Sequence, residues 1–478
     1  MDMTDSAAIA VPAKGRTTKR TRTTAMIVAS AFFMQNLDAT VISTALPTMA
    51  RAFGADPVHM NVALTSYLIS LAIFIPASGW VADRYGGRNV FRMAIAVFTL
   101  GSILCGRAES LPFLVFARIV QGAGGAMMIP VGRLVLMRTA AKSEVVAAMA
   151  WLTTPALIGP ILGPPLGGLI VTYLSWRWIF DINIPIGIIG IVLASIFIED
   201  VREPPNARFD LLGLVLSAVA LAGLMFGFET IGRGVADLWM SLAAFACGLL
   251  SGFLYWLHAR RHPAPLIDFG LMKFKSFAVS VYAGSLFRIG VGALPFLLPM
   301  MLQIAFGNTA VQSGLITFAS AAGAFLMKPV AQRVLRRFGF RDTLVCNAAF
   351  AAIMLGLCAT FSPGWPAIAM YGVLLVGGFF RSLQFTAYNA LAYADLQRSQ
   401  MSAATSFYSA VQQLSLTIGI TIGAASLQVT MWMSQHTEPG ATDFRLAFVV
   451  IAAIALLAAP VSGLMPRETG EEMSGASR

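Results

Sequence analysis

One carboxylate stands alone near mid-depth of a long apolar segment. Asp38 lies within residues 25–47, an apolar run long enough to cross a lipid bilayer. A charge at that depth costs about 2.5–3.5 kcal/mol on insertion scales, so it normally faces a cavity or a partner. Desolvation favours the protonated carboxyl group and a nearby cation favours the ionised one, so a group balanced between them can load and release protons. We expect Asp38 to be a proton carrier; the alternative is a structural hydrogen bond between helices.

Arg118 is the expected partner of this carboxylate. Arg118, Gln121, Gly122 and Gly125 fall on one face of a predicted helix over residues 112–136. Arg118 is about six residues from the outer end of its span and Asp38 about nine from its own, so at 1.5 Å per residue their depths differ by less than one turn. The alternative is an arginine that only braces backbone carbonyls.

Further polar residues inside apolar segments are candidates to line a substrate cavity. They are Gln35, Asn36, Gln121, Arg288 and Arg381. If Arg288 and Arg381 line it, the cavity is net positive, because Asp38 is the only deep carboxylate; this favours neutral or anionic substrates over lipophilic cations. Either arginine could instead brace backbone.

A glycine–proline segment predicts a bent, closely packed membrane helix over residues 146–173. Glycines recur every four residues, which leaves one bare helical stripe where another backbone can approach. The neighbouring prolines each remove a backbone donor and bend the helix. The residues concerned are Gly159, Pro160, Gly163, Pro164, Gly167 and Gly168.

A loop rich in glycine and charge connects the spans predicted at 61–82 and 90–107. It is either a topology anchor or, as we favour, a charged contact between two halves of the protein. Its key residues are Gly79, Asp83, Arg84, Gly86 and Arg88. A similar sequence, Arg336 to Arg341, follows the second span of the second half and aligns Gly339 with Gly86.

These residues must be positioned by membrane helices, because the composition is that of a polytopic membrane protein. The chain has 478 residues, is 57% hydrophobic and only 12% charged, and has a mean hydropathy of +0.76. We expect an all-α polytopic membrane protein of two six-helix bundles with two extra central spans. The fourteen predicted spans are 25–47, 61–82, 90–107, 112–136, 146–173, 178–198, 211–230, 239–257, 277–305, 313–332, 342–361, 366–391, 401–432 and 445–465.

The distribution of basic residues predicts the orientation. Fourteen spans place both termini on one side, and most Lys and Arg residues fall on that side, which indicates that it is cytoplasmic. The opposite side has only Arg51, Arg107, Arg177, Arg233 and Arg445. The net charge of +11 is therefore a topology signal, and we expect no nucleic-acid partner.

The predicted organisation is a cytoplasmic tail, a bundle, a linker with two spans, a second bundle and a second tail. The boundaries are 1–24, 25–199, 200–276, 277–465 and 466–478. No nucleotide-binding loop, nucleophile elbow or zinc-protease motif occurs, so we expect no enzyme activity, no metal and no cofactor. The four cysteines lack metal spacing and are expected to be packing residues.

Together these motifs resemble the major facilitator superfamily, specifically its fourteen-span drug:proton antiporters of the EmrB/QacA type and, among them, MdtD-like multidrug exporters. The resemblance covers residues 25–465 and rests on the loop Gly79–Arg92, on Arg118–Ala126 and on Gly159–Gly168. Residues Leu37–Pro47 and Trp176–Gly187 resemble the fourteen-span branch. Two departures are Gly87, where a basic residue is usual, and Asp181, where an apolar one is usual.

The resemblance implies a proton-driven exporter of small amphipathic molecules, such as drugs, in the cytoplasmic (inner) membrane. It implies alternating access, with Asp38 as proton carrier, Arg118 tuning it, and the proton gradient as energy source. We expect a monomer in the lipid bilayer; a periplasmic adaptor, as some relatives use, is left open. The alternatives are an uptake permease, a metabolite exporter unrelated to drug resistance, and a non-transporting sensor or scaffold.

Overall fold

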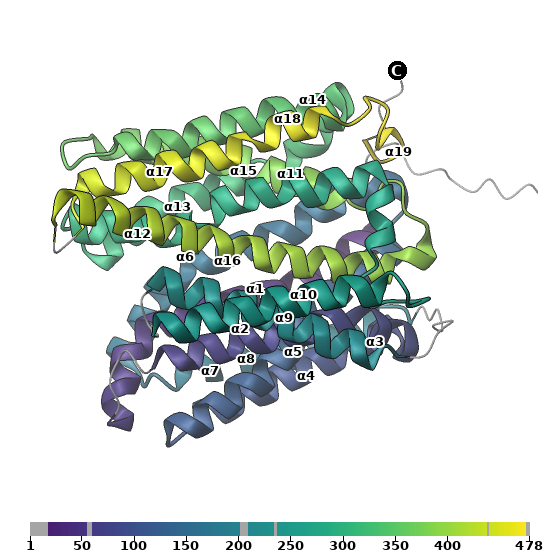
Figure 1. The fold of residues 1–478 in the computed structure, drawn as a ribbon, viewed down its shortest axis with the longest axis horizontal. Coiled ribbons are helices and arrows are strands. Elements are labelled where there is room, and N and C mark those ends of the chain that lie inside the picture. The colour runs from purple at the N-terminus through teal and green to yellow at the C-terminus, as the bar shows by residue number, and fades with distance from the viewer. Residues whose placement is uncertain (1–17, 55–59, 201–208, 234–236, 437–438, 475–478) are drawn as a thin grey trace, which may run out of the picture.

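Long helices that run side by side build the whole molecule (Figure 1). The computed structural model describes residues 18–54, 60–200, 209–233, 237–436 and 439–474, and no strand occurs among them. Twelve helical segments in these ranges are long and apolar enough to cross a membrane. The protein is thus a multi-pass membrane protein of the expected all-α class, and the number of fourteen crossings stays a prediction.

The first block of helices packs around α1, α4 and α5. Helix α1 lies along α6, α5 lies along both α2 and α4, and α8 covers α1 and α4. Pro76, in a 3-10 turn, separates α2 from α3, as expected where proline removes a backbone donor. The helices are α1 (Lys19–Phe53), α2 (Asn61–Phe74), α3 (Ser78–Tyr85), α4 (Gly87–Gly106), α5 (Leu111–Thr139), α6 (Val145–Tyr173), α7 (Trp178–Asp181) and α8 (Asn183–Phe197).

The second block packs α11 against α16 and α17, and α15 against α13 and α14. A π-helical turn, Met301–Ala305, extends α12. The helices are α11 (Lys275–Gly292), α12 (Leu294–Met300), α13 (Ala310–Leu326), α14 (Lys328–Leu357), α15 (Ala367–Leu391), α16 (Met401–Ser434), α17 (Ala441–Leu456), α18 (Ala458–Gly463) and the short α19 (Glu471–Ser474).

Two glycines at corresponding places in the blocks turn the chain between spans. Gly86, between α3 and α4, has φ 88°, and Gly339, inside α14, has φ 72°. A side chain would be strained at both, which is why glycine stands there. Gly339 therefore divides α14 into two helices, and the first of them continues the span begun by α13. The two aligned sequence segments thus make equivalent turns.

The two central helices form a hairpin that touches both blocks. Helix α9 (Leu211–Arg233) lies along α10 (Leu238–Ala259) with glycine contacts, because a Cβ on Gly223 would lie 3.0 Å from Gly248 Cα. Helix α9 also contacts α2 of the first block and α16 of the second. In Figure 1 the teal α9 and α10 lie between the two groups of helices. The hairpin thus covers one side of the interface between the blocks.

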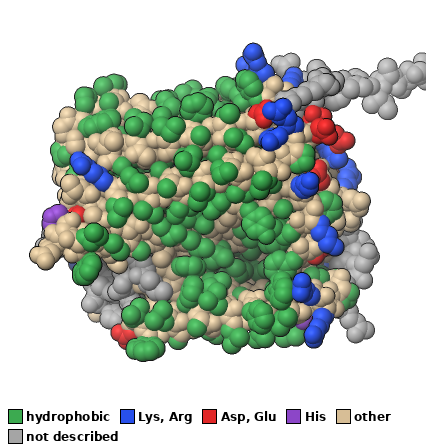
Figure 2. Space-filling view, turned by 45° about the horizontal axis from the view of Figure 1, so that its top comes forward, with side chains coloured by type: hydrophobic (Ala, Val, Ile, Leu, Met, Phe, Trp, Pro, Cys, Tyr) green, Lys and Arg blue, Asp and Glu red, His purple; other side chains and the backbone are tan. Residues whose placement is uncertain are grey.

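Charged side chains gather at one end of the molecule. Figure 2 shows Lys and Arg concentrated on the right, beside a mainly apolar middle region. We call this end, which carries Arg84, Lys142, Lys273 and the C-terminal helix α19, the basic end. Large apolar side chains such as Trp239, Leu250 and Phe253 are exposed along the flanks. Such faces suit the hydrocarbon of a bilayer, where apolar side chains need no cover.

Candidate functional site

The structure brings Asp38 of α1 and Arg118 of α5 into direct contact. Arg118 Nη1 donates to Asp38 Oδ2 at 2.6 Å, and both side chains are fully buried. The pair lies inside the first block, nearer the end opposite the basic one. The cost of burying two charges is compensated only when the remaining polar atoms of the pair are also hydrogen-bonded. The stability of this pair therefore depends on the residues around it.

Two amides complete the coordination of the carboxylate. Asp38 Oδ1 accepts hydrogen bonds from Gln121 Nε2 at 2.8 Å and from Asn183 Nδ2 at 3.0 Å. Both amides also donate to Ser102 Oγ, at 2.7 and 3.1 Å. The two oxygens of Asp38 thus accept hydrogen bonds from three side chains, one of which is its counter-charge Arg118.

Arg118 is held from three directions. Its Nη1 also donates to Gln121 Oε1 at 2.6 Å, its Nε donates to Ala63 O at 3.2 Å, and its guanidinium lies 4.2 Å from the ring centroid of Tyr67. Its Nη2 has no hydrogen-bond partner among the described residues. Arg118 therefore both pairs with Asp38 and braces a carbonyl, so the two alternatives for this residue are combined.

Asn183 and Ser102 are site residues that the sequence did not single out. Asn183 falls in the Trp176–Gly187 segment quoted for the family resemblance, and only its contact with Asp38 shows why an amide stands there. Two residues earlier, Asp181 Oδ2 lies 3.4 Å from Arg107 Nη1. The unexpected carboxylate at position 181 thus forms a partly exposed ion pair at the outer end.

Part of the glycine stripe of α6 packs against α1 beside the ion pair. A Cβ on Gly159 would lie 3.0 Å from Leu37 N, and one on Gly163 would overlap the Thr40 side chain. Gly167 is buried, whereas a Cβ on Gly168 would meet no atom of the described residues within 4 Å. Pro160 and Pro164 lie within the helix, but their side chains fall outside the described residues. Helix α6 also contacts α13 and α15 of the second block.

The polar residues expected in a cavity occupy different surroundings. Gln35 is buried near Tyr67 and Gly125, close to the ion pair, and Gln121 belongs to the pair's own coordination. Asn36 donates to Phe32 O at 2.8 Å, within α1. Arg288 lies on α11 of the second block, where its Nη2 donates to Tyr408 OH of α16 at 2.6 Å.

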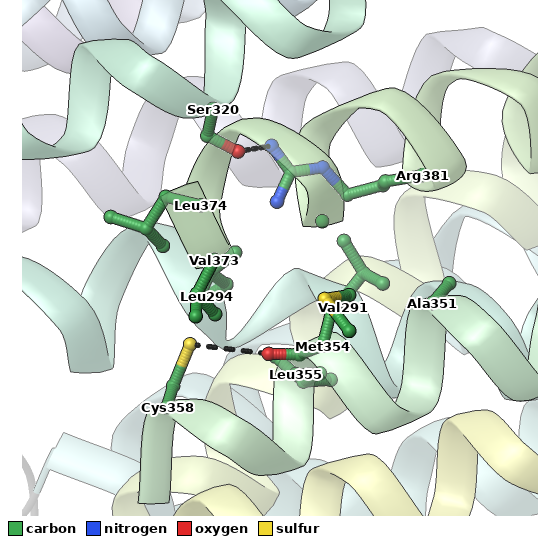
Figure 3. A pocket seen from close by; sticks show the side chains of 11 residues that line it. Val291, Leu294, Ser320, Ala351, Met354, Leu355, Cys358, Val373, Leu374 and Arg381 are labelled. Atoms are coloured by element: carbon green, nitrogen blue, oxygen red, sulfur yellow. Dashed lines mark hydrogen bonds between the residues drawn. The ribbon is translucent and has the colours of Figure 1, made fainter. Parts of the chain in front are cut away.

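Arg381 faces a cavity inside the second block. Arg381 Nη2 donates to Ser320 Oγ at 2.6 Å beside a small cavity of about 20 Å³. Figure 3 shows this arrangement, with apolar residues such as Leu294, Met354 and Leu374 around it. Helices α11, α12, α13, α14 and α15 enclose the cavity, so Arg381 and Arg288 line separate sites.

The charged loop joins the blocks at the basic end. Asp83 Oδ1 accepts from Arg138 Nη2 at 2.6 Å within the first block, and Asp83 Oδ2 accepts from Ser402 Oγ at 2.5 Å across the interface. Gly79 N donates to Ser406 Oγ at 2.8 Å, also across it. At this end the blocks therefore meet where the Asp83 carboxylate and the Gly79 backbone amide bind serine hydroxyl groups in the first turns of α16. Arg84 is exposed and Arg88 half-buried.

One further cluster has the donor atoms of a metal site. Asp210, His258 and His262, at the basic end of the α9–α10 hairpin, offer ligand atoms within 4.8 Å of one another. His258 Nε2 lies 2.8 Å from Asp210 Oδ1, and this hydrogen bond ties the start of α9 to the end of α10. Imidazole and carboxylate groups are ligands that transition metals accept. Among the described residues this is the group of three whose ligand atoms lie close enough together to hold a metal ion.

Comparisons with known proteins match almost the whole chain. The family model of the Major Facilitator Superfamily matches residues 28–283 and 280–476. The "Putative multidrug resistance protein MdtD" of Klebsiella pneumoniae (strain 342) is 39% identical over 450 residues, 93% of this chain and 94% of that protein. The protein of the same name from Escherichia coli (strain K12 / DH10B) is 38% identical over 464 residues, 96% of this chain and 98% of that protein.

Two solved structures share the fold at low sequence identity. The human organic anion transporter MFSD10 (TETRAN) gives a TM-score of 0.66 with 13% identity over 92% of this chain and 99% of that one. The proton:xylose symporter XylE gives 0.64 with 14% identity over 95% of this chain and 97% of that one. These similarities establish the architecture of this chain.

Proposed function

This chain belongs to the Major Facilitator Superfamily, and we propose that it is a proton-coupled exporter of small amphipathic compounds such as drugs. The observation that carries the proposal is the fully buried Asp38–Arg118 pair. The two blocks rock against each other and open the interface to either side in turn, while proton influx drives efflux. The protein is a transporter and not an enzyme.

Proton binding at Asp38 changes the forces on helices that reach the second block. A protonated Asp38 no longer compensates the charge of Arg118, so the guanidinium must find other acceptors and α1 and α5 adjust against each other. Helix α1 packs on α6 at Gly159 and Gly163, and α6 contacts α13 and α15. The adjustment therefore reaches the interface between the blocks. Return of Arg118 to the ionised carboxylate releases the proton.

We assign the basic end to the cytoplasm, because basic residues are retained on that side of membranes. Contacts of Gly79 and Asp83 with α16 close this end in the present conformation. The structure then corresponds to a state closed toward the cytoplasm, and export requires these contacts to break so that substrate can enter.

The test compares two carboxylates in inside-out vesicles with an acidic lumen. Transport of substrate into the lumen should dissipate the pH gradient in wild-type vesicles and in Asp181→Asn, whose carboxylate is partly exposed and paired with Arg107. Asp38→Asn should abolish this coupling while leaving substrate binding intact. Undiminished proton release with Asp38→Asn would refute the assignment. Accumulation driven only toward the cytoplasmic side would show an uptake permease instead.

A further inference from the structure

A second buried polar cluster, which we call the arginine network, joins the two blocks. Arg133 Nη1 of α5 donates to Gln412 Oε1 of α16 at 2.9 Å, and Gln412 Nε2 donates to Asn389 Oδ1 of α15 at 2.9 Å. Arg288 Nη2 of α11 donates to the same Asn389 oxygen at 3.2 Å and to Tyr408 OH at 2.6 Å. One chain of hydrogen bonds thus links two arginines from different blocks.

The two guanidinium groups of the network lack a counter-charge. Arg133 is 4% exposed and Arg288 is 1% exposed. All their hydrogen-bond acceptors are neutral oxygens, and among the described residues neither arginine forms an ion pair with a carboxylate. Burying a charge without such compensation is costly. By contrast, Arg118 in the same block has Asp38, and Arg138 has Asp83.

Several N–H groups of the network also remain unused. Arg133 Nε, Arg288 Nε and Arg288 Nη1 are buried and have no hydrogen-bond partner among the described residues. A guanidinium presents its N–H groups as a planar fork that matches the two oxygens of a carboxylate. The unused donors therefore indicate an acceptor with negative charge.

The network lies at a contact that alternating access must break. Along α5, Arg133 is roughly 22 Å from Arg118 at 1.5 Å per residue, toward the basic end. The Arg133–Gln412 hydrogen bond crosses from one block to the other, near the Gly79 and Asp83 contacts with the same helix α16. When the basic end opens, Arg133 loses this acceptor and becomes accessible together with Arg288.

We propose that Arg133 and Arg288 bind the acidic group of the transported molecule, so that the exported compounds are amphipathic organic anions. This inference rests on the proposed export function and names its substrate class. In the closed conformation Gln412 and Asn389 occupy part of the anion's place. Substrate from the cytoplasm supplies the missing negative charge, and the two amides return to the arginines after the anion has left on the opposite side.

Aromatic rings beside the arginines suit the apolar part of such a substrate. The guanidinium carbons of Arg133 and Arg288 lie 5.5 and 4.8 Å from the Tyr408 ring centroid, and Arg288 lies 5.8 Å from that of Phe385. Phe287 packs edge-on against Phe385. A carboxylate attached to an aromatic or aliphatic body would find both of its parts matched.

Binding of two matched probes to the purified full-length protein tests this inference. The probes are 2-naphthoate and 2-naphthylmethylammonium, which share a ring system and differ in charge, measured by calorimetry in detergent. Wild type should bind the anion about tenfold more tightly or better, since charge-assisted hydrogen bonds contribute this much. Arg133→Gln and Arg288→Gln should each weaken anion binding about 10- to 100-fold. Arg288→Lys should restore part of the loss, because the charge returns without the planar fork.

A variant that supplies the counter-charge internally separates binding from misfolding. Gln412→Glu keeps the side-chain size and gives Arg133 a carboxylate, so it should raise the melting temperature while it weakens binding of 2-naphthoate. Lys328→Gln removes a positive charge outside the network and should leave binding unchanged. The inference is overturned if the cation binds better, if neither probe binds, or if 2-naphthoate binding survives in folded Arg133→Gln and Arg288→Gln.

The same probe distinguishes failure of this inference from failure of the export proposal. Asp38→Asn should still bind 2-naphthoate but should no longer couple its movement to protons. If wild-type vesicles move 2-naphthoate without dissipating the pH gradient, proton coupling is wrong and the anion site stands. If they couple protons to the cationic probe alone, the anion site is wrong and the export proposal stands.

Discussion

Replacing Gly79 with alanine should push the two blocks apart at the basic end. A Cβ at this position would lie 2.5 Å from Ser402 O and 2.7 Å from Ser406 Oγ, both on α16. Close C···O contacts in proteins are about 3.3–3.6 Å, so α3 and α16 must separate by about 1 Å to make room. The Ser402 oxygen belongs to the backbone and cannot rotate away. The contact that closes this end is therefore directly weakened.

The magnitude follows from the cost of overpacking. An added methyl group in a well-packed contact costs about 1–3 kcal/mol, and if only the closed state bears this cost, the equilibrium shifts about 5- to 150-fold toward open forms. Spin labels at Tyr85 and Gln397, which are exposed on either side of the contact, report the separation by pulsed electron resonance. The native cysteines Cys105, Cys247, Cys346 and Cys358 are first replaced.

The expected result of Gly79→Ala is a loss of the short label distance and growth of a longer one. Gly168→Ala is the matched control, because its Cβ would meet no atom within 4 Å in the part of the chain that the structure describes, and it should leave the distances unchanged. If Gly79→Ala also leaves them unchanged, the contact with α16 does not hold this end closed, and the reasoning is refuted.

Three further predictions concern stability. Asp83→Asn should lower the free energy of unfolding by about 2 kcal/mol, seen as a lower melting temperature, because buried Arg138 loses the Asp83 carboxylate. Arg84→Gln on the same loop should have little effect. Gly163→Ala should destabilise the α1–α6 contact by about 1–3 kcal/mol, and adding Thr40→Ala should recover part of the loss in a double-mutant cycle of thermal unfolding. Lys142 lowers the pKa of exposed Glu472, 2.7 Å away, so this pair holds α19 to the first block above the ordinary glutamate pKa and is lost as pH falls through the lowered one. The hydrogen-exchange protection factor of α19, which compares its rate with that of an unfolded chain at the same pH, should fall in acid. Glu472→Gln should remove that pH dependence. A wild-type protection factor that does not change with pH would contradict this prediction.

Much of the ion-pair site was predictable because depth in a membrane can be counted along a sequence. Asp38 and Arg118 were expected within one turn of the same depth, and the structure places their side-chain atoms 2.6 Å apart. Gly86 and Gly339 align in sequence and both adopt positive φ, since each ends one helix and starts the next. These are local or one-dimensional properties, and one sequence carries them.

The arginine network could not be predicted by counting the depth of residues along the spans. Arg133 lies close to the predicted end of its span and carries no sequence signal that separates it from the basic residues of the adjoining loop. Its place in the network depends on Gln412 and Asn389, which are more than 250 residues away in the chain; Gln412 is 279 residues away. Arg288 and Arg381 look equivalent in sequence, yet they line different sites.

Three features follow from the amino-acid sequence alone: many membrane crossings, helix breaks at particular prolines and glycines, and one carboxylate in the middle of an apolar span. These features depend on the length of an apolar segment, on the backbone conformations open to a residue and on the cost of burying a charge. Each of these acts within a short stretch of chain, so it can be predicted from the local sequence. Which polar groups meet depends on the tertiary structure: Asn183 and Ser102 lie around Asp38, Asp83 contacts the start of α16, and Arg133 and Arg288 join one network without an ion pair among the described residues. Those contacts depend on helix rotation and on packing between distant segments, which hydropathy along one chain does not specify.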